Sequence, residues 1–403
     1  MKPNLAAAVA VACLVALATD KAAASESVFG LQFLGTSDET GDARARGLGV
    51  LGAALDDTMT ALASNPAALG GLRYMTFSFA AVAGWRDAST ATASTQQEFA
   101  RFPQLRAALP LFGKVVLATG YASLRNFRGD FALQPRSIDG LDYVQSFERE
   151  GSLYTIPVTL AATLGSRVRV GASVDFLLGT IDEQWITRGP SLIPISSGRR
   201  DEFHGTSTHF GVVVLPWPWL RVAGSWAPEF SADRERRMTI KDGSQGSTAD
   251  PFRVETTNTK VQFPQAVRAG ATVVLRRGLL LAGDALWREW PAYEGSLYEA
   301  QAVGDEVRIG AGLEYKRGLW STVRAGVSRW TWGAEVGGNP VHETAVHFGL
   351  GVPLAPGKGG FHLALEHAWV GSLAENGHEE KVWRVVVSVS GQETWLRKAP
   401  RPR

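Results

Sequence analysis

Four histidines near the end of the sequence could bind a metal ion if their imidazoles converged. They are His342, His347, His362 and His367. Each pair is separated by five residues, and an odd separation along an extended strand places two side chains on opposite faces. Four convergent ligands are therefore excluded, and we expect no metal site. The favoured interpretation puts His347 and His362 on the same face as Glu366, with a cross-strand His347–Glu366 pair.

A glycine-rich segment offers a second possible chemistry. Residues 47–52 read GLGVLG, which matches the G-x-G-x-x-G pattern of dinucleotide sites. That site needs a parallel α/β unit around it, and no such pattern follows, so we interpret the glycines as close packing within a compact plug. Motifs of serine hydrolases, zinc proteases and calcium loops are absent from the sequence. We therefore expect no enzyme activity and no cofactor.

The elements that carry the remaining charged residues have a period of two. From Val307 to Lys316 the odd positions are apolar and the even ones are charged or glycine, and segments 167–176, 267–276 and 383–390 follow the same rule. This period predicts β-strands with one apolar and one polar face. In a soluble sandwich the apolar face packs in the core, whereas in a membrane barrel it contacts lipid. Alternation alone leaves both folds open.

The lengths of the connections favour the membrane barrel. Short connections alternate with longer polar stretches, which are predicted as loops at 86–95, 127–149, 183–205, 230–258, 291–304, 333–340 and 373–379. Short turns at one end and long loops at the other are typical of outer-membrane barrels. The scheme predicts an antiparallel all-β transmembrane barrel of fourteen strands, an even number that returns both ends to the short-turn side.

Tryptophan positions support the same interpretation. Three tryptophans fall by the short turns and five at the far strand ends, namely Trp217, Trp219 and Trp320, and Trp85, Trp290, Trp330, Trp332 and Trp369. Two bands predict the aromatic girdles of a membrane barrel. The alternative, a soluble exported β-protein, would instead use tryptophan in its core.

The first residues have the pattern of a secretory signal peptide. Met1-Lys2 precedes an apolar run over residues 5–18, and Ala22-Ala23-Ala24 provides a cleavage site. The only cysteine, Cys13, lies in this run, so the chain after residue 24 lacks thiols for disulfides or metal sites. An acylated Cys13 would require a longer apolar segment before it.

The rest of the chain divides into three parts. After residue 24 no apolar stretch is long enough for a membrane-spanning helix. The formal net charge of +2 gives no field that would attract nucleic acid. We expect a signal peptide at 1–24, a hatch at 25–72, the barrel at 73–391 and a basic periplasmic tail at 392–403.

Several segments carry a resemblance to a known family. They are RARGLG at 44–49, NPAAL at 65–69, FPQAVRAG at 263–270 and LAGDALW at 281–287. In these segments the chain resembles the FadL/TodX transporters of long-chain fatty acids and hydrocarbons. The resemblance implies a fourteen-stranded barrel plugged by an N-terminal hatch, in agreement with the strand count. PorV-like barrels carry a similar Asn-Pro-Ala segment, so a secretion or assembly scaffold is the alternative.

The resemblance also implies a function and its residues. It implies passive, hatch-gated passage of hydrophobic small molecules through the Gram-negative outer membrane, with sideways release through a gap in the wall. The expected partners are outer-membrane lipids, a hydrophobic ligand and the barrel-assembly machinery, with the protein as a monomer. We expect the gate at Gly47, Gly49, Gly52, Asn65, Pro66 and Ala67. Alternation predicts a polar network in the lumen at Arg268, Asp284, Arg308, Glu314, Arg324, His347, Glu366 and Arg384.

Two features depart from the family pattern. Ala68 stands where the family usually has glycine, which leaves the turn possible. The chain also continues past Ser390 into a basic segment, whereas the family leads us to expect a terminal strand that ends in an aromatic residue.

Overall fold

The computed structural model describes most of the chain after the predicted signal peptide. The described residues are 27–32, 35–38, 41–55, 61, 64–111, 114–132, 136–138, 141–190, 192–242, 253–276, 278–290, 304–317, 321–355 and 359–393. The predicted signal peptide and residues 394–403 of the predicted tail lie outside the described residues.

Strands make up nearly all of the described chain after residue 74. They are β2 Met75–Thr90, β3 Ser94–Pro110, β4 Val115–Asn126, β5 Gly129–Ala132, β6 Arg136–Ile138, β7 Leu141–Leu164, β8 Val168–Gly189, β9 Leu192–Trp217, β10 Leu220–Ala227, β11 Phe230–Asp242, β12 Arg253–Phe263, β13 Ala266–Arg276, β14 Leu279–Arg288, β15 Glu306–Arg317, β16 Ser321–Val336, β17 Asn339–Ala355, β18 Gly359–Ser372 and β19 His378–Glu393. A short helix, α4 Leu373–Asn376, joins β18 to β19.

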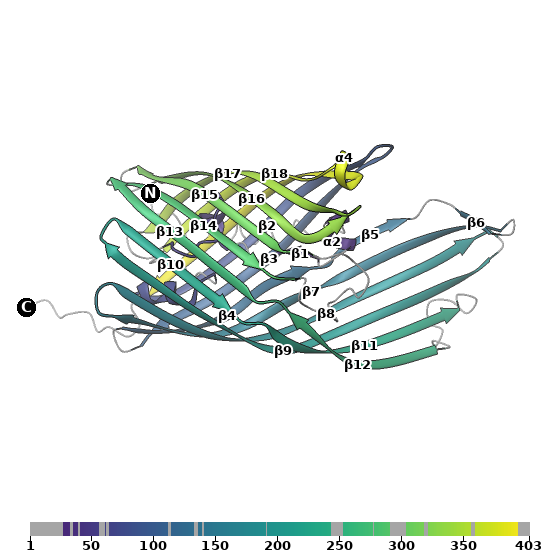
Figure 1. Ribbon diagram of the computed structural model, residues 1–403, viewed down its shortest axis with the longest axis horizontal. Helices are drawn as coiled ribbons and strands as arrows, with labels where there is room; N and C mark the ends of the chain where they lie inside the picture. The colour runs from purple at the N-terminus through teal and green to yellow at the C-terminus, as the bar shows by residue number, and fades with distance from the viewer. Residues whose placement is uncertain are drawn as a thin grey trace, which may run out of the picture.

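These strands form one closed antiparallel barrel (Figure 1). The last strand, β19, pairs with the first, β2, from His378↔Thr90 to Glu393↔Met75, and this pairing closes the sheet. Three barrel strands are interrupted: β4 continues as β5 and β6 along β7, β10 continues as β11 along β9, and β12 continues as β13. Counted in this way, the described residues form fourteen barrel strands, which confirms the predicted fold.

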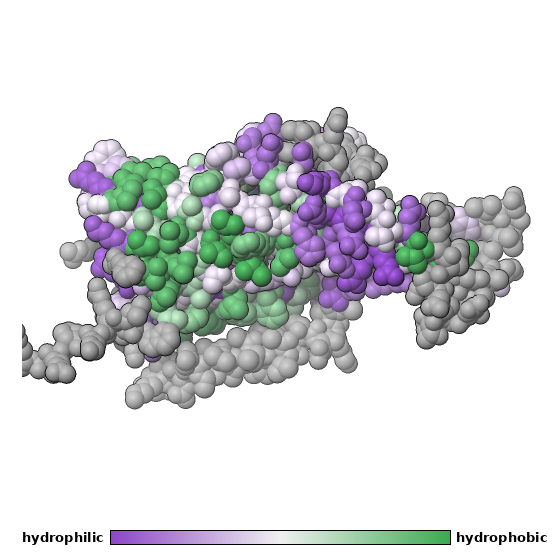
Figure 2. Space-filling model, turned by 90° about the horizontal axis from the view of Figure 1, so that it is seen from below, coloured by the Kyte–Doolittle hydropathy of each residue, from purple (hydrophilic) through white to green (hydrophobic). Residues whose placement is uncertain are grey.

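The apolar face of the strands points outward. On β15, Ile309 and Leu313 are exposed whereas Arg308 is buried. Figure 2 shows the hydrophobic surface as a belt over the half of the barrel nearer the short turns, with hydrophilic side chains over the other half. An apolar exterior around a polar interior is the arrangement of a membrane barrel.

Five of the predicted long loops, at 86–95, 127–149, 183–205, 230–258 and 333–340, are wrong, because strands run through most of each. The strands β8 and β9 cover most of 183–205, and β11 and β12 cover much of 230–258. Here the sequence places charged residues such as Asp182, Arg200 and Glu202 on the strands, so the apolar alternation stops. The ladder hydrogen bonds join backbone groups only, so a strand can continue past the apolar belt without an apolar face.

The predicted tryptophan girdle is correct only in part. Trp217 and Trp219 beside a short turn, and Trp85 and Trp369 at the far ends, are exposed. The prediction for Trp290, Trp330 and Trp332 is wrong, because each is at most 6% exposed and packs inside the barrel. Their positions in the alternation point inward, and distance from the turn could not show this. Trp320 lies outside the described residues.

The chain before β2 fills the barrel. It contains α2 Val28–Gln32, β1 Thr36–Ser37, α3 Ala43–Gly47 and the 3-10 helix η1 Pro66–Gly71. Helices this short are marginal alone, so contacts with the wall must hold them. None of the described helices is long and apolar enough to span a membrane.

Candidate functional site

Glycines in the wall make room for the backbone of the hatch. A Cβ at Gly310, Gly312 or Gly326 would come within 3.0 Å of the carbonyl oxygens of Gly49 or Leu48. Across the barrel, a Cβ at Gly171 would meet the backbone of Pro66, and one at Gly211 would meet the side-chain amide of Asn65. The hatch therefore seats on the wall at two places, and glycine is required at both because atoms of the hatch occupy the space of a side chain.

A methyl group at one of these seats is expected to displace the hatch. In Gly310→Ala, the new Cβ overlaps the Gly49 carbonyl, a conflict that costs on the order of 1–3 kcal/mol in packed interiors. We expect a rise in ion leakage through reconstituted protein, measured as bilayer conductance. The matched control is Gly283→Ala, whose Cβ would have no neighbour nearer than 3.5 Å. Equal conductance in the two variants would contradict a seat at Gly310.

Two carboxylates inside the barrel, one fully and one mostly buried, bind arginines of the hatch. Glu314 accepts hydrogen bonds from Arg44 Nε and Nη2 at 2.8 and 2.7 Å, and from Arg324 Nε at 2.6 Å. Glu366 accepts from Arg46 Nη1 at 2.6 Å and also contacts Arg384. Bidentate and charge-assisted contacts of this kind are the strongest hydrogen bonds in proteins. They fix α3 to the wall at both of its arginines.

The predicted histidine–carboxylate pair is present. His347 Nδ1 lies 3.3 Å from Glu366 Oε2, and the two residues are directly opposite on β17 and β18. His347 Nε2 shares a hydrogen bond of 2.8 Å with Ser328 Oγ. Burial lowers the pKa of Arg46, the hatch partner of Glu366, to about 10, so this arginine stays charged at neutral pH. Among the described residues, no group of His, Cys, Asp or Glu is arranged to hold a metal ion.

Asp284 holds the hatch through its backbone. Its two carboxylate oxygens accept from the amide nitrogens of Leu51, Gly52 and Ala53 at 3.0, 2.7 and 3.3 Å. Gly49 and Gly52 have φ of 69° and 90°, which only glycine adopts without strain, so the turn that presents these amides depends on both. The glycine-rich turn thus presents backbone amides to a carboxylate of the barrel wall.

The Asn65-Pro66-Ala67 segment joins the other end of the hatch to the wall. Asn65 caps η1 by accepting from the Ala67 amide at 2.9 Å, and Pro66 begins the helix. The side-chain amide of Asn65 also donates to the carbonyls of Ala53, Val212 and Gly224 at 3.1–3.4 Å. One side chain therefore connects both parts of the hatch to β9 and β10.

The predicted lumen residues form separate groups. Two ion-pair clusters form, one of Glu314 with Arg324 and one of Glu366 with His347 and Arg384. Asp284 instead binds backbone amides of the hatch. Arg308 lies over the ring of Trp330 at 5.7 Å, and Arg268 lines a cavity. The arginines of the hatch, Arg44 and Arg46, were not predicted as members, because their helix showed no period that could place their side chains.

The wall is incomplete between β3 and β4. These strands pair only from Gln104↔Ala122 to Pro110↔Val116, although β3 extends back to Ser94 and β4 forward to Asn126. Among the described residues no ladder joins the remaining parts, 94–103 and 123–126. We call this stretch the seam. Phe102 and Leu105 beside it are exposed on the outer surface.

A strap of the N-terminal chain closes the seam from inside. The strand β1 pairs with the open part of β4, with Thr36↔Asn126 and Ser37↔Arg125. Asp38 then bridges both sides, because it lies 2.7 Å from Arg101 Nε of β3 and accepts from Ser123 Oγ of β4 at 2.7 Å. The seam is therefore held by side chains and one short strand, which separate more easily than a full ladder.

A cavity lies between the hatch and the seam. Its open volume, which includes its mouth, is about 1260 Å³. The lining combines apolar groups such as Pro103, Phe230 and Phe263 with polar groups such as Arg106 and His209. Pro66 of the hatch and Ser123 of the seam both face it. A concave site lined mainly by apolar groups with a few polar ones is typical of small-molecule sites.

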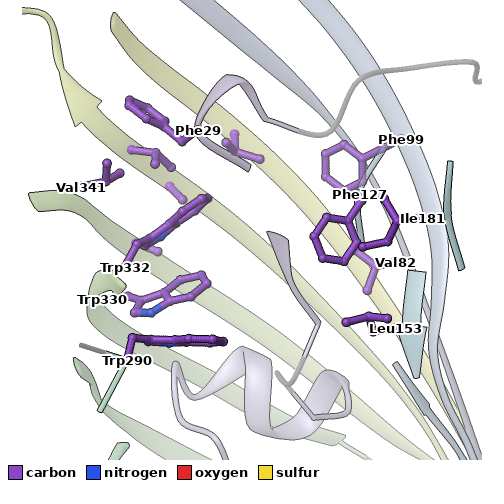
Figure 3. Close-up of a cluster of buried hydrophobic side chains, with 14 of the residues drawn as sticks. Phe29, Val82, Phe99, Phe127, Leu153, Ile181, Trp290, Trp330, Trp332 and Val341 are labelled. Atoms are coloured by element: carbon purple, nitrogen blue, oxygen red, sulfur yellow. The ribbon is translucent and has the colours of Figure 1, made fainter. Parts of the chain in front are cut away.

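An aromatic cluster continues from this cavity toward the long connections. Figure 3 shows Trp290, Trp330 and Trp332 stacked along one side, with Phe99 and Phe127 across from them. The centroids of the Trp330 and Trp332 rings are 4.9 Å apart. These rings give the lumen an apolar part on the side of the long connections, next to the polar part that holds the hatch.

The barrel with its seated hatch defines the class of this protein as a hatch-plugged outer-membrane β-barrel. The chain belongs to the BamG family, because the BamG family model matches residues 1–400. None of the curated protein sequences matches the chain.

Solved structures agree on the fold. A FadL homologue from Pseudomonas aeruginosa superimposes with a TM-score of 0.64 at 12% identity, over 89% of this chain and 99% of that one. The toluene transporters TbuX of Ralstonia pickettii and TodX of Pseudomonas putida give TM-scores of 0.58 and 0.56 at 16% and 12% identity. They cover 91% and 89% of this chain, and 100% and 98% of their own. The sequence resemblance to FadL and TodX is thus confirmed for the fold.

Proposed function

We propose that this protein carries hydrophobic small molecules across the Gram-negative outer membrane by passive diffusion. The observation that supports this most strongly is the seam, because it lies between the lined cavity and the apolar outer surface of the barrel. Structures named as toluene transporters and a FadL homologue share this fold. Sideways release into lipid spares an apolar solute a return to water, which costs roughly 25 cal/mol per Å² of its surface.

The proposed path has three steps. A solute enters the aromatic cluster from the long-connection end, where apolar rings replace its contact with water. It moves into the cavity above η1, and the hatch blocks the direct way to the short-turn end. Release of the Asp38 contacts then opens the seam between β3 and β4. The gate thereby includes the strap as well as the predicted hatch residues.

Uptake by cells that lack this protein tests the proposal. Radiolabelled long-chain fatty acid and toluene are supplied to cells complemented with wild type, with Asn65→Ala/Pro66→Ala, or with Arg101→Cys/Ser123→Cys. We expect wild type to restore uptake of at least one solute. A short bismaleimide that joins the two cysteines, which lie on opposite sides of the seam, should abolish that uptake, because β3 and β4 can no longer part. Uptake unchanged by the cross-link would contradict exit through the seam.

A scaffold for secreted or assembling proteins is the second candidate. BamG membership favours it, since the name suggests the barrel-assembly machinery. The charged strands β8, β9 and β11 beyond the apolar belt offer a surface for protein contact. Wild-type complementation that restores no uptake, together with specific co-purification of assembly components, would favour this role over transport.

A further inference from the structure

One ion pair joins opposite walls of the barrel. Arg125 lies on β4 and Glu306 on β15, the third and tenth of the fourteen barrel strands, so they face each other across the lumen. Arg125 Nη2 donates to Glu306 Oε2 at 2.9 Å, and both side chains are at most 9% exposed. Barrel ion pairs usually join neighbouring strands, as Arg236 and Asp201 do on β11 and β9. We call Arg125 and Glu306 the clasp.

Further contacts hold the clasp in place. Glu306 Oε2 also accepts from Arg288 Nη1 at 2.7 Å and from Trp290 Nε1 at 2.9 Å. The Arg125 guanidinium lies 5.1 Å from the centroid of the Trp290 ring. A buried carboxylate with three donors and an arginine over an aromatic face compensate the desolvation of both charges.

The clasp lies where the aromatic cluster meets the cavity. Trp290 and Leu153 belong to the cluster and also line the cavity. Arg125 itself lines the cavity, while Glu306 is the first residue of β15, at its long-connection end. A solute that moves from the cluster to the cavity must therefore pass beside this bridge.

We propose that the clasp is a gate across the lumen, distinct from the hatch, and that it determines which solutes reach the cavity. When Arg125 and Glu306 part, a hydrophobic solute can pack its apolar surface on the Trp290 ring in place of the contacts that the ring loses. A hydrated ion makes no such apolar contact with the ring. This inference rests on the proposed function only for the identity of the solute. The barrier itself would exist for any compound that enters from outside.

Thiol accessibility measures the barrier directly. No cysteine follows Cys13, so Ser207→Cys places a single reporter among the residues that line the cavity. Whole cells are treated with a charged methanethiosulfonate, and the rate of modification is compared with and without Arg125→Met or Glu306→Gln. We expect each to raise the rate about tenfold or more, because a buried pair that loses one partner no longer favours the closed arrangement. The double variant should add little, because both changes open the same barrier.

Two controls separate a gate from a general brace. Arg236→Met breaks an ion pair between neighbouring strands and should leave the reporter rate unchanged. Lys114→Cys, exposed at a short turn, reports entry of the reagent into the periplasm and should react equally in all backgrounds. Reporter rates that stay at the parent value, or that rise equally with Arg236→Met, would overturn the proposal. Faster labelling without any solute uptake would support the gate while contradicting the transport function.

Discussion

Deletion of residues 41–69 is expected to convert the closed barrel into an open, water-filled pore. This segment includes α3, the glycine turn and the start of η1, which seat against wall glycines on both sides of the lumen. Without it, Glu314, Glu366 and Asp284 lose their hatch partners and become hydrated, so water and ions can fill the space. The measurement is stepwise conductance in planar bilayers, which the full-length protein should lack.

The control for this deletion is the fold of the barrel itself. An inserted barrel migrates differently in SDS before and after boiling, so heat modifiability reports folding independently of conductance. The fourteen strands pair with one another without help from the deleted segment, and we expect the shift to remain. A chain that fails to insert would show that the hatch acts first as a folding element. An inserted barrel without conductance would contradict the hatch as the main plug.

The sequence predicted the wall better than the seam in it. Alternation located the strands because each membrane-facing residue must be apolar, a strong and periodic constraint. Along β4 the buried positions change from even numbers, Val116 and Ala118, to odd numbers, Ser123 and Arg125, and the register on β7 also shifts between Ser123 and Arg125. Arg125 therefore points inward against the simple alternation, and the clasp could not be predicted.

The contacts of the hatch could not be predicted from the periodicity of the sequence either. Two residues of the predicted gate, Gly49 and Asn65, pack against wall glycines. Which carboxylate each hatch group would meet depends on a fold with more than two hundred residues between partners, as for Asp284 and Gly52. Short helices leave no amphipathic pattern from which such partners could be derived. The role of these residues in gating stays a prediction.

Glu366→Gln is expected to destabilise the protein by about 3 kcal/mol, at the low end of the loss seen when a buried ion pair loses one partner. Glu366 is 1% exposed and meets Arg46, Arg384 and His347, so the substitution keeps its shape but leaves these cationic groups short of negative charge. Glu343 remains as a partner of Arg384, at 2.7 Å, whereas Arg46 of the hatch loses the carboxylate that it binds. The hatch should therefore loosen before the barrel does.

Urea unfolding in detergent, followed by the mobility shift in SDS, measures the free energy of the whole barrel. Proteolysis of the hatch under native conditions measures its local release, and we expect this to accelerate more than barrel unfolding. The matched control is Glu375→Gln on α4, an exposed carboxylate whose removal should change neither quantity measurably. Stability equal to wild type in Glu366→Gln would show that the inward charges are hydrated in the native barrel. The hatch would then be held by its backbone contacts with Asp284 and the wall glycines alone.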